Sequence, residues 1–250
     1  MQSVWVEETV VKTYQADFQQ QWKPSAFFQV MQEAASNHAA SLGFGYDEML
    51  ANNLLWILSR VKVRFESFPR LGDQVIVRTW PKGVQQRVFF MRDFVMQNPD
   101  GRRYATATSA WILIDPVARH LLPPRALKTP FPDNDGLSAM DDILEKINPP
   151  EGMPEHHRVY AGYSAVDMVG HVNNTHYIDW VSDCFPMDDY RRKLDWLQIN
   201  YLNEVHPGEN VALHCDGGAG QGNESLVLGV NLDTNLRAFE VATGWARPGG

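Results

Sequence analysis

Apolar and polar positions alternate along most of this chain, and two stretches interrupt the alternation with helical spacing. Residues 4–18 alternate and are rich in β-branched side chains, which predicts a strand. The helix-forming run 26–42 follows Pro24, which suits a first helical turn, and ends at Gly43. A shorter helix is expected at 46–53. The chain thus begins with a predicted strand and a long predicted helix.

Four alternating segments follow, separated by the turn sequences PRLGD, PKG and NPDG. The predicted strands are residues 54–67, 73–81, 87–97 and 103–114. A long helix followed by an antiparallel meander favours an α+β layer architecture in which the sheet wraps the helix.

The segment 115–155 departs from this pattern. It contains eight prolines and a patch of acidic residues, so it cannot form continuous secondary structure. We predict a connection between domains here, interrupted by a short helix at 139–146.

The second half of the chain repeats the pattern of the first. Its predicted elements are a strand at 158–167, a helix at 174–184 and strands at 194–205, 210–217, 224–232 and 237–246. Eight positions also match without gaps at a constant spacing of 136 residues. They are Leu58, Val61, Val63, Phe65, Gly72, Asp73, Val75 and Val77, matched by Leu194, Leu197, Ile199, Tyr201, Gly208, Glu209, Val211 and Leu213. We infer two copies of one unit, residues 1–130 and 156–250, joined by a linker at 131–155.

Composition narrows the class of protein. With 44% hydrophobic and 21% charged residues, the 250-residue chain resembles ordinary globular proteins. No apolar run approaches the ~20 residues of a membrane span and no signal peptide begins the chain, which predicts a cytoplasmic protein. A formal net charge of −8 argues against nucleic-acid binding. Cys184 and Cys215 form no CxxC pair, so the sequence indicates neither a disulfide framework nor a zinc site.

Polar residues gather at one helix entry, in the stretch 167–180 (DMVGHVNNTHYIDW). Asn173 or Asn174 suits the N-cap of this helix, whose positive end can bind an anion or a developing oxyanion. The structural alternative is that these residues only cap the helix. His171 and His176 are five residues apart and do not share a helix face, so we expect no metal site.

The two copies differ at this helix entry. The matching pairs are Asp17 and Asp167, Gln20 and Gly170, Gln21 and His171, Phe27 and Tyr177, Val30 and Trp180 at a spacing of 150 residues, and Phe68 and Glu204 at 136. The first copy lacks the histidine and the glutamate but keeps the apolar frame. Our hypothesis is that the second unit carries out chemistry while the first supplies a hydrophobic slot. Neutral drift between two structural copies is the alternative.

Three stretches together resemble a known family. They are Asp-x-x-Gly-His-Val-Asn-Asn-x-x-Tyr-x-x-Trp at 167–180, LWILSR at 55–60 and INYLNE at 199–204. They are similar to the fatty acyl-ACP thioesterases of plants and bacteria, and the repeat resembles their double hotdog fold. The resemblance implies two tandem hotdog units, each a long helix wrapped by an antiparallel sheet. It also implies hydrolysis of fatty acyl-ACP to free fatty acid and holo-ACP.

The resemblance implies that Asp167, His171 and Glu204 form the catalytic site, without a cofactor. The family usually has an asparagine two residues before the histidine, where this chain has Val169. Its plant members also carry a cysteine after the glutamate, where this chain has Val205. We therefore expect no asparagine amide at position 169 to orient water or thioester here.

Thioester hydrolysis needs an activated water or a carboxylate nucleophile, together with donors for the tetrahedral oxyanion. We predict Glu204 as the base, because it interrupts an apolar strand that should face the helix. Asp167 is predicted to orient His171 or a backbone amide, and the reverse assignment of the two carboxylates stays open. The predicted oxyanion and positioning residues are Gly170, Val172, Asn173 and Asn174.

The acyl chain needs a long apolar tunnel, for which the first unit supplies candidates. The predicted substrate-binding residues are Phe27, Met31, Trp56 and Leu58. The implied partner is an acyl carrier protein bearing a phosphopantetheine-linked acyl chain, and a homodimer is left open. The candidate basic residues for docking this acidic protein are Arg87, Arg92, Arg102, Arg103 and the run 191–193.

Two other functions fit the same fold. An acyl-CoA thioesterase would prefer CoA to the carrier protein. A non-catalytic module that binds acyl thioesters is favoured by Val169 at the asparagine position.

Overall fold

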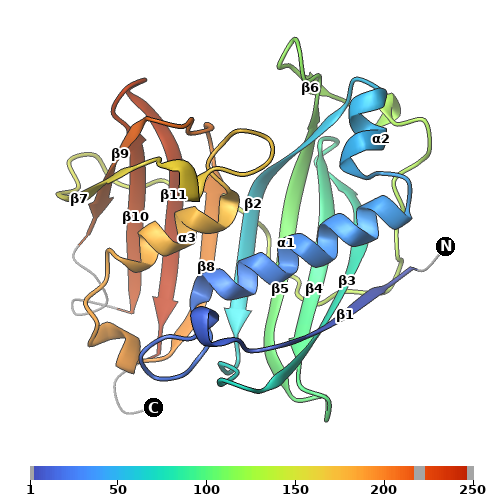
Figure 1. Ribbon diagram of the computed structural model, residues 1–250. Helices are drawn as coiled ribbons and strands as arrows, with labels where there is room; N and C mark the ends of the chain where they lie inside the picture. Colours follow the sequence, from blue (N-terminus) through green and yellow to red (C-terminus); the bar gives the residue numbers. More distant parts are fainter. Residues whose placement is uncertain (1–2, 217–222, 247–250) are drawn as a thin grey trace. The chain divides into compact units, whose positions relative to one another are not determined.

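The computed structural model describes residues 3–216 and 223–246, which fold into two compact units, Met1–Leu144 (unit 1) and Glu145–Gly250 (unit 2). In each unit a helix lies across one face of an antiparallel sheet (Figure 1). This arrangement confirms the predicted α+β class with an internal duplication. Gly217, the predicted end of one strand, lies outside the described residues.

Unit 1 contains the long helix α1 (Pro24–Ser41) and the short helix α2 (Tyr46–Ala51). Its strands are β1 (Trp5–Val10), β2 (Leu55–Phe65), β3 (Gln74–Gln85), β4 (Phe89–Gln97), β5 (Arg103–Ile114) and β6 (Leu121–Leu122). They pair in the order β1-β3-β4-β5-β2, with β6 beside β5, and every one of these pairings is antiparallel.

Unit 2 has one shorter helix, α3 (Asn174–Ser182), and a sheet of the same kind. Its strands are β7 (Glu155–Tyr160), β8 (Leu194–Tyr201), β9 (Asn210–Cys215), β10 (Glu224–Asn231) and β11 (Leu236–Trp245). The order is β8-β11-β10-β9-β7, again antiparallel. The short 3-10 turns of the two units are η1 (Thr13–Gln15), η2 (Pro124–Ala126), η3 (Tyr163–Ala165) and η4 (Asp189–Arg191).

Aromatic rings fix α1 to the sheet of unit 1. Phe27 is fully buried and meets Trp22, Phe65 and Phe68 edge-on, with ring centroids 5.1, 5.0 and 5.4 Å away. Such edge-to-face pairs add about 0.5–1.5 kcal/mol each to the burial of the rings. Pro24 occupies the first turn of the helix, as predicted, because the missing N–H costs nothing there.

The strands predicted before α1 and α3 both end earlier in the structure than expected. The strand expected at 4–18 ends at Val10, because the backbone then forms η1 and a tight turn at Asp17. The strand expected at 158–167 likewise ends at Tyr160. By contrast, the predicted strand 103–114 is confirmed at both ends by β5.

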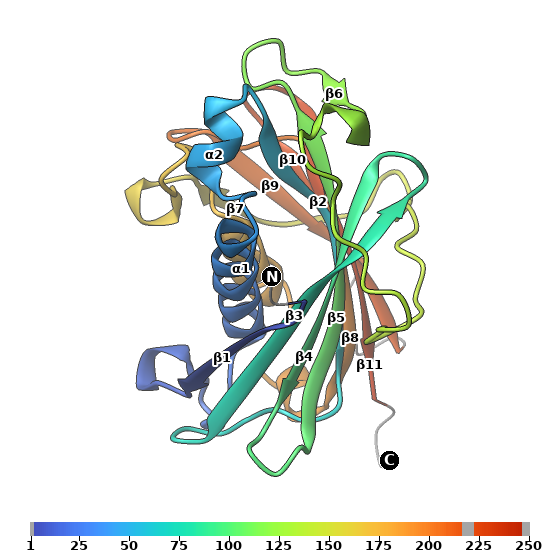
Figure 2. The same ribbon diagram turned by 90° about the vertical axis from the view of Figure 1, so that its right-hand side faces the viewer.

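Within unit 1, the part of the proline-rich segment that follows η2 (residues 127–144) packs along the sheet, on the face opposite α1 (Figure 2). Asp142 pairs with Lys62 and Arg64 at 2.8 and 2.6 Å, and the carbonyl of Leu144 accepts a hydrogen bond from Arg60. These cations, with Arg64 contributing most, hold the pKa of Asp142 well below its usual range. The helix predicted at 139–146 is wrong, because contacts with the sheet hold this segment extended.

The duplication extends to individual hydrogen bonds at the spacings found in the sequence. The amide of Val11 donates to the backbone carbonyl of Asp73 (3.0 Å), and the amide of Ala161 donates to the backbone carbonyl of Glu209 (2.9 Å). The first-unit positions therefore have the same backbone surroundings as their second-unit partners, which allows a residue-by-residue comparison of the two units.

Candidate active site

Asp167 builds the turn that leads into α3. Its Oδ1 accepts from the amide of Val169 (2.9 Å), its carbonyl accepts from Gly170 (3.0 Å), and its amide donates to the His171 carbonyl (2.9 Å). Gly170 has a φ of +89°, which glycine adopts without strain. Asp167 thus fixes the backbone that carries His171.

Unit 1 has the same turn at Asp17. Its Oδ1 accepts from the amide of Gln19 (2.8 Å), its carbonyl accepts from Gln20 (3.0 Å), and its amide donates to Gln21 (2.8 Å). Gln20 takes up the left-handed conformation here, with a φ of +62°. Since unit 1 has no histidine at this turn, the hydrogen bonds that Asp17 and Asp167 share are structural.

His171, Glu204 and His206 come together beside this turn. His171 Nε2 lies 3.6 Å from Glu204 Oε2, and the rings of His171 and His206 meet edge-on at 4.8 Å. The side chains of His171 and Glu204 are 22% and 25% exposed, so solvent water reaches both. The structure therefore brings together the predicted histidine and glutamate.

Glu204 does not lie in a strand, which corrects the expected strand 194–205. β8 ends at Tyr201, because the amides of Leu202 and Asn203 both turn to the carbonyl of Ala238 (2.9 and 3.1 Å). Glu204 follows in the loop, where its side chain turns to the helix entry rather than into the sheet.

Sequence reasoning missed His206. It lies in an exposed loop, where no hydrophobic pattern marks a residue. The repeat contained a signal, however, because the position 136 residues earlier is Arg70. Gln21 and Arg70 form an isolated bridge in unit 1, and His171 and His206 meet at the same two positions of unit 2.

The same three side chains offer a set of metal ligands. One ligand atom from each of His171, Glu204 and His206 lies within 4.8 Å of the others. Two imidazoles and a carboxylate suit a divalent ion such as Zn²⁺. His176 instead lies 3.6 Å from Asp179 on α3.

Two tyrosines of unit 2 lie close to these groups, where unit 1 has phenylalanines. Tyr177 is buried on α3 and shares a hydrogen bond with the backbone of Val205. Burial raises its pKa, and the charges of Glu204 and Asp167 raise it further. The Tyr201 hydroxyl donates to the carbonyl of Asn174 (3.0 Å), and burial raises its pKa as well.

The predicted oxyanion and positioning residues already make hydrogen bonds within unit 2. The amide of Val172 donates to Val205 (2.9 Å), and that of Asn173 donates to Ala165 (2.8 Å). Asn173 is the N-cap of α3 and accepts from the Thr175 amide (3.0 Å) and hydroxyl (2.8 Å). The Gly170 amide donates as well, so the backbone amides of Gly170, Val172 and Asn173 all have acceptors within unit 2. Asn174 is the first residue of α3.

The predicted substrate-binding residues belong to different parts of unit 1. Phe27 and Met31 are buried on α1. Trp56 packs edge-on against Phe90 (4.7 Å), beside Phe44 and α2. Leu58 is half-buried on β2. Phe27 and Trp56 therefore lie in two separate aromatic clusters of unit 1.

Arg92 cannot serve in a docking patch, because it is only 5% exposed. Its guanidinium meets His38 Nδ1 at 3.0 Å and donates to the Thr79 hydroxyl at 3.2 Å, inside unit 1. Burial lowers the pKa of Arg92 to about 10. The interior of unit 1 is therefore not purely apolar, although the hypothesis from the sequence assigned unit 1 a hydrophobic slot. The candidates that stay exposed are Arg87, Arg102, Arg103, Arg191 and Lys193.

Curated relatives of this chain are plant enzymes. It is 26% identical over 233 residues to the chloroplastic oleoyl-acyl carrier protein thioesterase of Coriandrum sativum, and the alignment covers 82% of this chain and 60% of the relative. It is 28% identical over 217 residues to the chloroplastic palmitoyl-acyl carrier protein thioesterase of Gossypium hirsutum, with 80% and 52% covered. The chain thus spans only about half to three fifths of the length of these relatives.

Solved structures show the same fold along the whole chain. The 12:0-ACP thioesterase from Umbellularia californica aligns with a TM-score of 0.83 and 22% identity, over 98% of each chain. An acyl-ACP thioesterase from Bacteroides thetaiotaomicron aligns with a TM-score of 0.79 and 23% identity, also over 98% of each. These similarities confirm the predicted fold of two tandem hotdog units.

The helices of residues 3–216 and 223–246 include none that is long and apolar enough to cross a membrane.

Two family models account for most of the chain. The N-terminal domain of acyl-ACP thioesterases matches residues 2–123, and their C-terminal domain matches residues 150–247. With both domains in order and the fold matched from end to end, this chain belongs to the acyl-ACP thioesterase family.

Proposed function

We propose that this protein hydrolyses fatty acyl-ACP thioesters to free fatty acid and holo-ACP. The observation that carries the proposal is the 3.6 Å contact between His171 Nε2 and Glu204 Oε2. It joins an acid–base pair to the positive end of α3, in a family whose members are named acyl-ACP thioesterases.

Glu204 acts as the base in this proposal. It takes a proton from water while the water oxygen bonds to the thioester carbonyl carbon, whose oxygen becomes the oxyanion. Collapse of the tetrahedral intermediate breaks the C–S bond, and the departing thiolate receives the proton through the neighbouring His171. A positioned base of this kind contributes ~10²–10⁴ in rate.

Asp167 is a positioning residue in this mechanism. Both carboxylate oxygens have partners, Oδ1 the amide of Val169 and Oδ2 the side-chain amide of Asn173 at 3.4 Å. Its equivalent Asp17 makes the same Oδ1 hydrogen bond in a unit without the histidine. This shared contact supports a role for Asp167 in holding the turn rather than in attacking the thioester.

The oxyanion is received at the first turn of α3. The amides of Gly170 and Val172 donate to carbonyls of unit 2, so they would have to break these hydrogen bonds to act as donors. Asn174 is the first residue of the nine-residue helix, where the amides point out of the helix end. We assign the role of oxyanion donor to the backbone amide of Asn174, assisted by the helix dipole.

Unit 1 receives the acyl chain in this proposal. Trp56 and Leu58, which are only half-buried, support this role, since each buried methylene of the acyl chain contributes ~0.8 kcal/mol. Phe27 and Met31 are already buried by the packing of α1. The acyl carrier protein is the proposed partner. A cytoplasmic location and a homodimer stay predictions from the sequence.

Hydrolysis of acyl-ACP by the Glu204→Gln variant tests the proposal. We expect kcat to fall ~10²–10⁴-fold, because glutamine keeps the size of the side chain but cannot accept the proton. The matched control is Glu66→Gln, which removes an exposed carboxylate in unit 1. Free thiol release should be measured with acyl-ACP and acyl-CoA side by side.

Four results would overturn or redirect the proposal. No turnover of either thioester, or equal kcat for Glu204→Gln and wild type, contradicts it. A preference for acyl-CoA supports the acyl-CoA thioesterase instead. Loss of turnover after treatment with a chelator, restored by Zn²⁺, would assign His171, Glu204 and His206 to a metal rather than to a base.

A binding module is the second candidate, favoured by Val169. The valine is 40% exposed and offers no polar group where the family usually has an amide. Tight binding of acyl-ACP that leaves the thioester intact over hours would support this function.

A further inference from the structure

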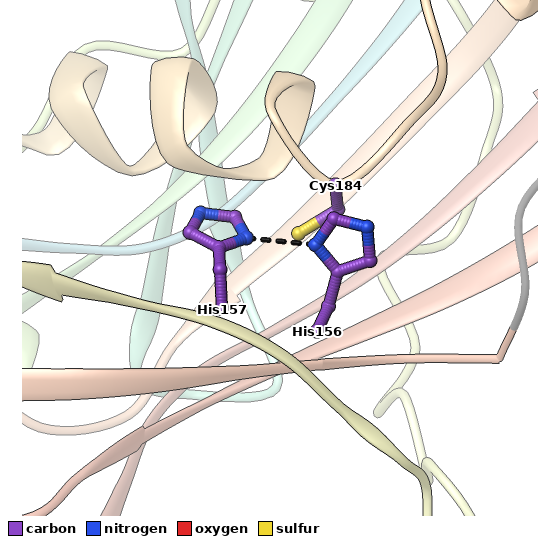
Figure 3. Close-up of side chains that lie close together, drawn as sticks. All are labelled: His156, His157 and Cys184. Carbon is purple, nitrogen blue, oxygen red and sulfur yellow. Dashed lines mark hydrogen bonds between the residues drawn. The ribbon is translucent and has the colours of Figure 1, made fainter.

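Two histidines and a cysteine meet at the other end of α3, away from the proposed catalytic residues. One ligand atom from each of His156, His157 and Cys184 lies within 4.8 Å of the others. Figure 3 shows both imidazoles turned to one another, with the sulfur beside them. The helix has nine residues, so roughly 14 Å of helix separates this cluster from the turn at Asn173.

A β-bulge explains how two neighbouring histidines face the same side. Side chains of successive strand residues normally point to opposite faces of a sheet. In β7, however, Glu155 pairs with His214 of β9 and His157 pairs with the next residue, Leu213, so His156 is an extra residue. Such bulges re-aim side chains at sheet edges, and β7 is an edge strand.

The three groups differ in exposure in a way that suits a bound ion. Cys184 is only 2% exposed, His157 is half-buried and His156 is exposed. An ion can thus approach from the side of His156 and reach the sulfur. The Nδ1 atoms of the two histidines are 2.8 Å apart, close enough for a hydrogen bond when no ion separates them.

The electrostatic surroundings of His157 and Cys184 oppose their charged forms when no ion is bound. Burial, followed by the neighbouring His156, lowers the pKa of His157. The negative charge of Asp183 acts in the opposite direction and raises this pKa by a smaller amount. Burial raises the pKa of the Cys184 thiol, so a cation is needed to stabilise the thiolate.

We propose that His156, His157 and Cys184 form a binding site for a thiophilic divalent cation of the Zn²⁺ class. Nitrogen and sulfur ligands are those of tetrahedral zinc, and a water molecule completes the fourth position. Binding forms one metal–sulfur bond and releases the thiol proton to solvent, with no change of oxidation state. The site is independent of the proposed hydrolysis, because it shares no residue with it.

Cobalt(II) titration of the full chain after chelator treatment tests the proposal. Thiolate-bound Co²⁺ gives a sulfur-to-metal charge-transfer absorption in the near ultraviolet, which histidine and carboxylate ligands do not. We expect this absorption to saturate at one Co²⁺ per chain and to disappear on addition of Zn²⁺. It should vanish in Cys184→Ser and persist in Cys215→Ser, the other buried cysteine.

Two further variants keep the test decisive. His156→Ala changes an exposed side chain and should weaken Co²⁺ binding at least ~10-fold even if Cys184→Ser fails to fold. His206→Ala alters the other candidate ligand group and should leave the absorption unchanged. Wild type without a thiolate absorption, or an absorption that survives Cys184→Ser, would overturn the site. Acyl-ACP hydrolysis by His156→Ala should equal that of wild type.

Discussion

The turns that lead into α1 and α3 share their backbone hydrogen bonds but not their side-chain chemistry. The backbone amide of Trp22 donates to the carbonyl of Pro69 in unit 1, and the backbone amide of Val172 donates to the carbonyl of Val205 in unit 2, both at 2.9 Å. The positions that differ around these turns are Gln21 and His171, Phe27 and Tyr177, Phe65 and Tyr201, Phe68 and Glu204, and Arg70 and His206. The fold of the two turns thus depends on backbone hydrogen bonds, which do not require a particular side chain. The two units differ in the side chains at these positions, and only unit 2 has the acid–base groups.

One pair of exchanges is coupled. Tyr177 has a hydrogen bond with the backbone of Val205, whereas the position equivalent to Val205 in unit 1 is Pro69, which has no N–H. The ring of Phe27 needs no such partner. A hydroxyl on the helix and an amide in the facing loop therefore occur together in unit 2 and are both absent from these positions of unit 1.

Exchanging the residue at the histidine position gives the largest expected effect. His171→Gln installs the residue of unit 1, and we expect kcat on acyl-ACP to fall ~10²-fold or more because the thiolate loses its proton donor. The melting temperature should stay unchanged, since Gln21 supports the same turn. Gln21→His is the control, and it should not change kcat. Equal activity of His171→Gln and wild type would remove His171 from the mechanism.

Adding a hydroxyl to unit 1 should destabilise it. Phe27→Tyr buries a hydroxyl opposite Pro69, and an unsatisfied buried group costs ~1–3 kcal/mol in the free energy of unfolding. The reverse exchange, Tyr177→Phe, loses one hydrogen bond and should cost about 1 kcal/mol. Denaturant unfolding measures both. A Phe27→Tyr variant as stable as wild type would show that the two exchanges are not coupled.

Alkaline pH should destabilise the protein through Tyr177 and Tyr201. Burial raises the pKa of both, so the folded state keeps protons that the unfolded state releases above its tyrosine pKa of about 10. Stability is then present below pH ~10 and lost above it, by about 1.4 kcal/mol per pH unit for each tyrosine. Melting temperatures between pH 9 and 11 check this. The double variant Tyr177→Phe/Tyr201→Phe should lose less than wild type, and a steeper loss would contradict the assignment.

The smallest effects are expected at the shared aspartates. Asp17→Asn and Asp167→Asn keep an oxygen that accepts the turn hydrogen bond, so each should cost no more than about 1 kcal/mol of unfolding free energy. Asp167→Asn should lower kcat less than ~10-fold, well below the ~10²–10⁴-fold loss expected when a general base is removed. A loss of ~10²-fold or more with unchanged stability would make Asp167 the acting carboxylate in place of Glu204.

Local patterns predicted the elements whose burial follows a regular period. The alternation at 103–114 gave both ends of β5, and the repeat spacing matched the equivalent turns at Asp17 and Asp167. Tertiary contacts decided the rest. β8 stops before Glu204 because two amides turn to one carbonyl of β11, and the residues before Leu144 stay extended because the sheet holds them. His206 escaped notice because a contact between two loops leaves no periodicity.

The extended segment before Leu144 also determines where this chain can be cut. A fragment ending at residue 130 would expose Met91 and Ala110, which Leu144 covers, and would separate Lys62 from Asp142. An exposed apolar sheet face is a surface on which chains aggregate. Expression of the first unit alone should therefore extend to residue 144, even though the last paired strand of its sheet ends at Leu122.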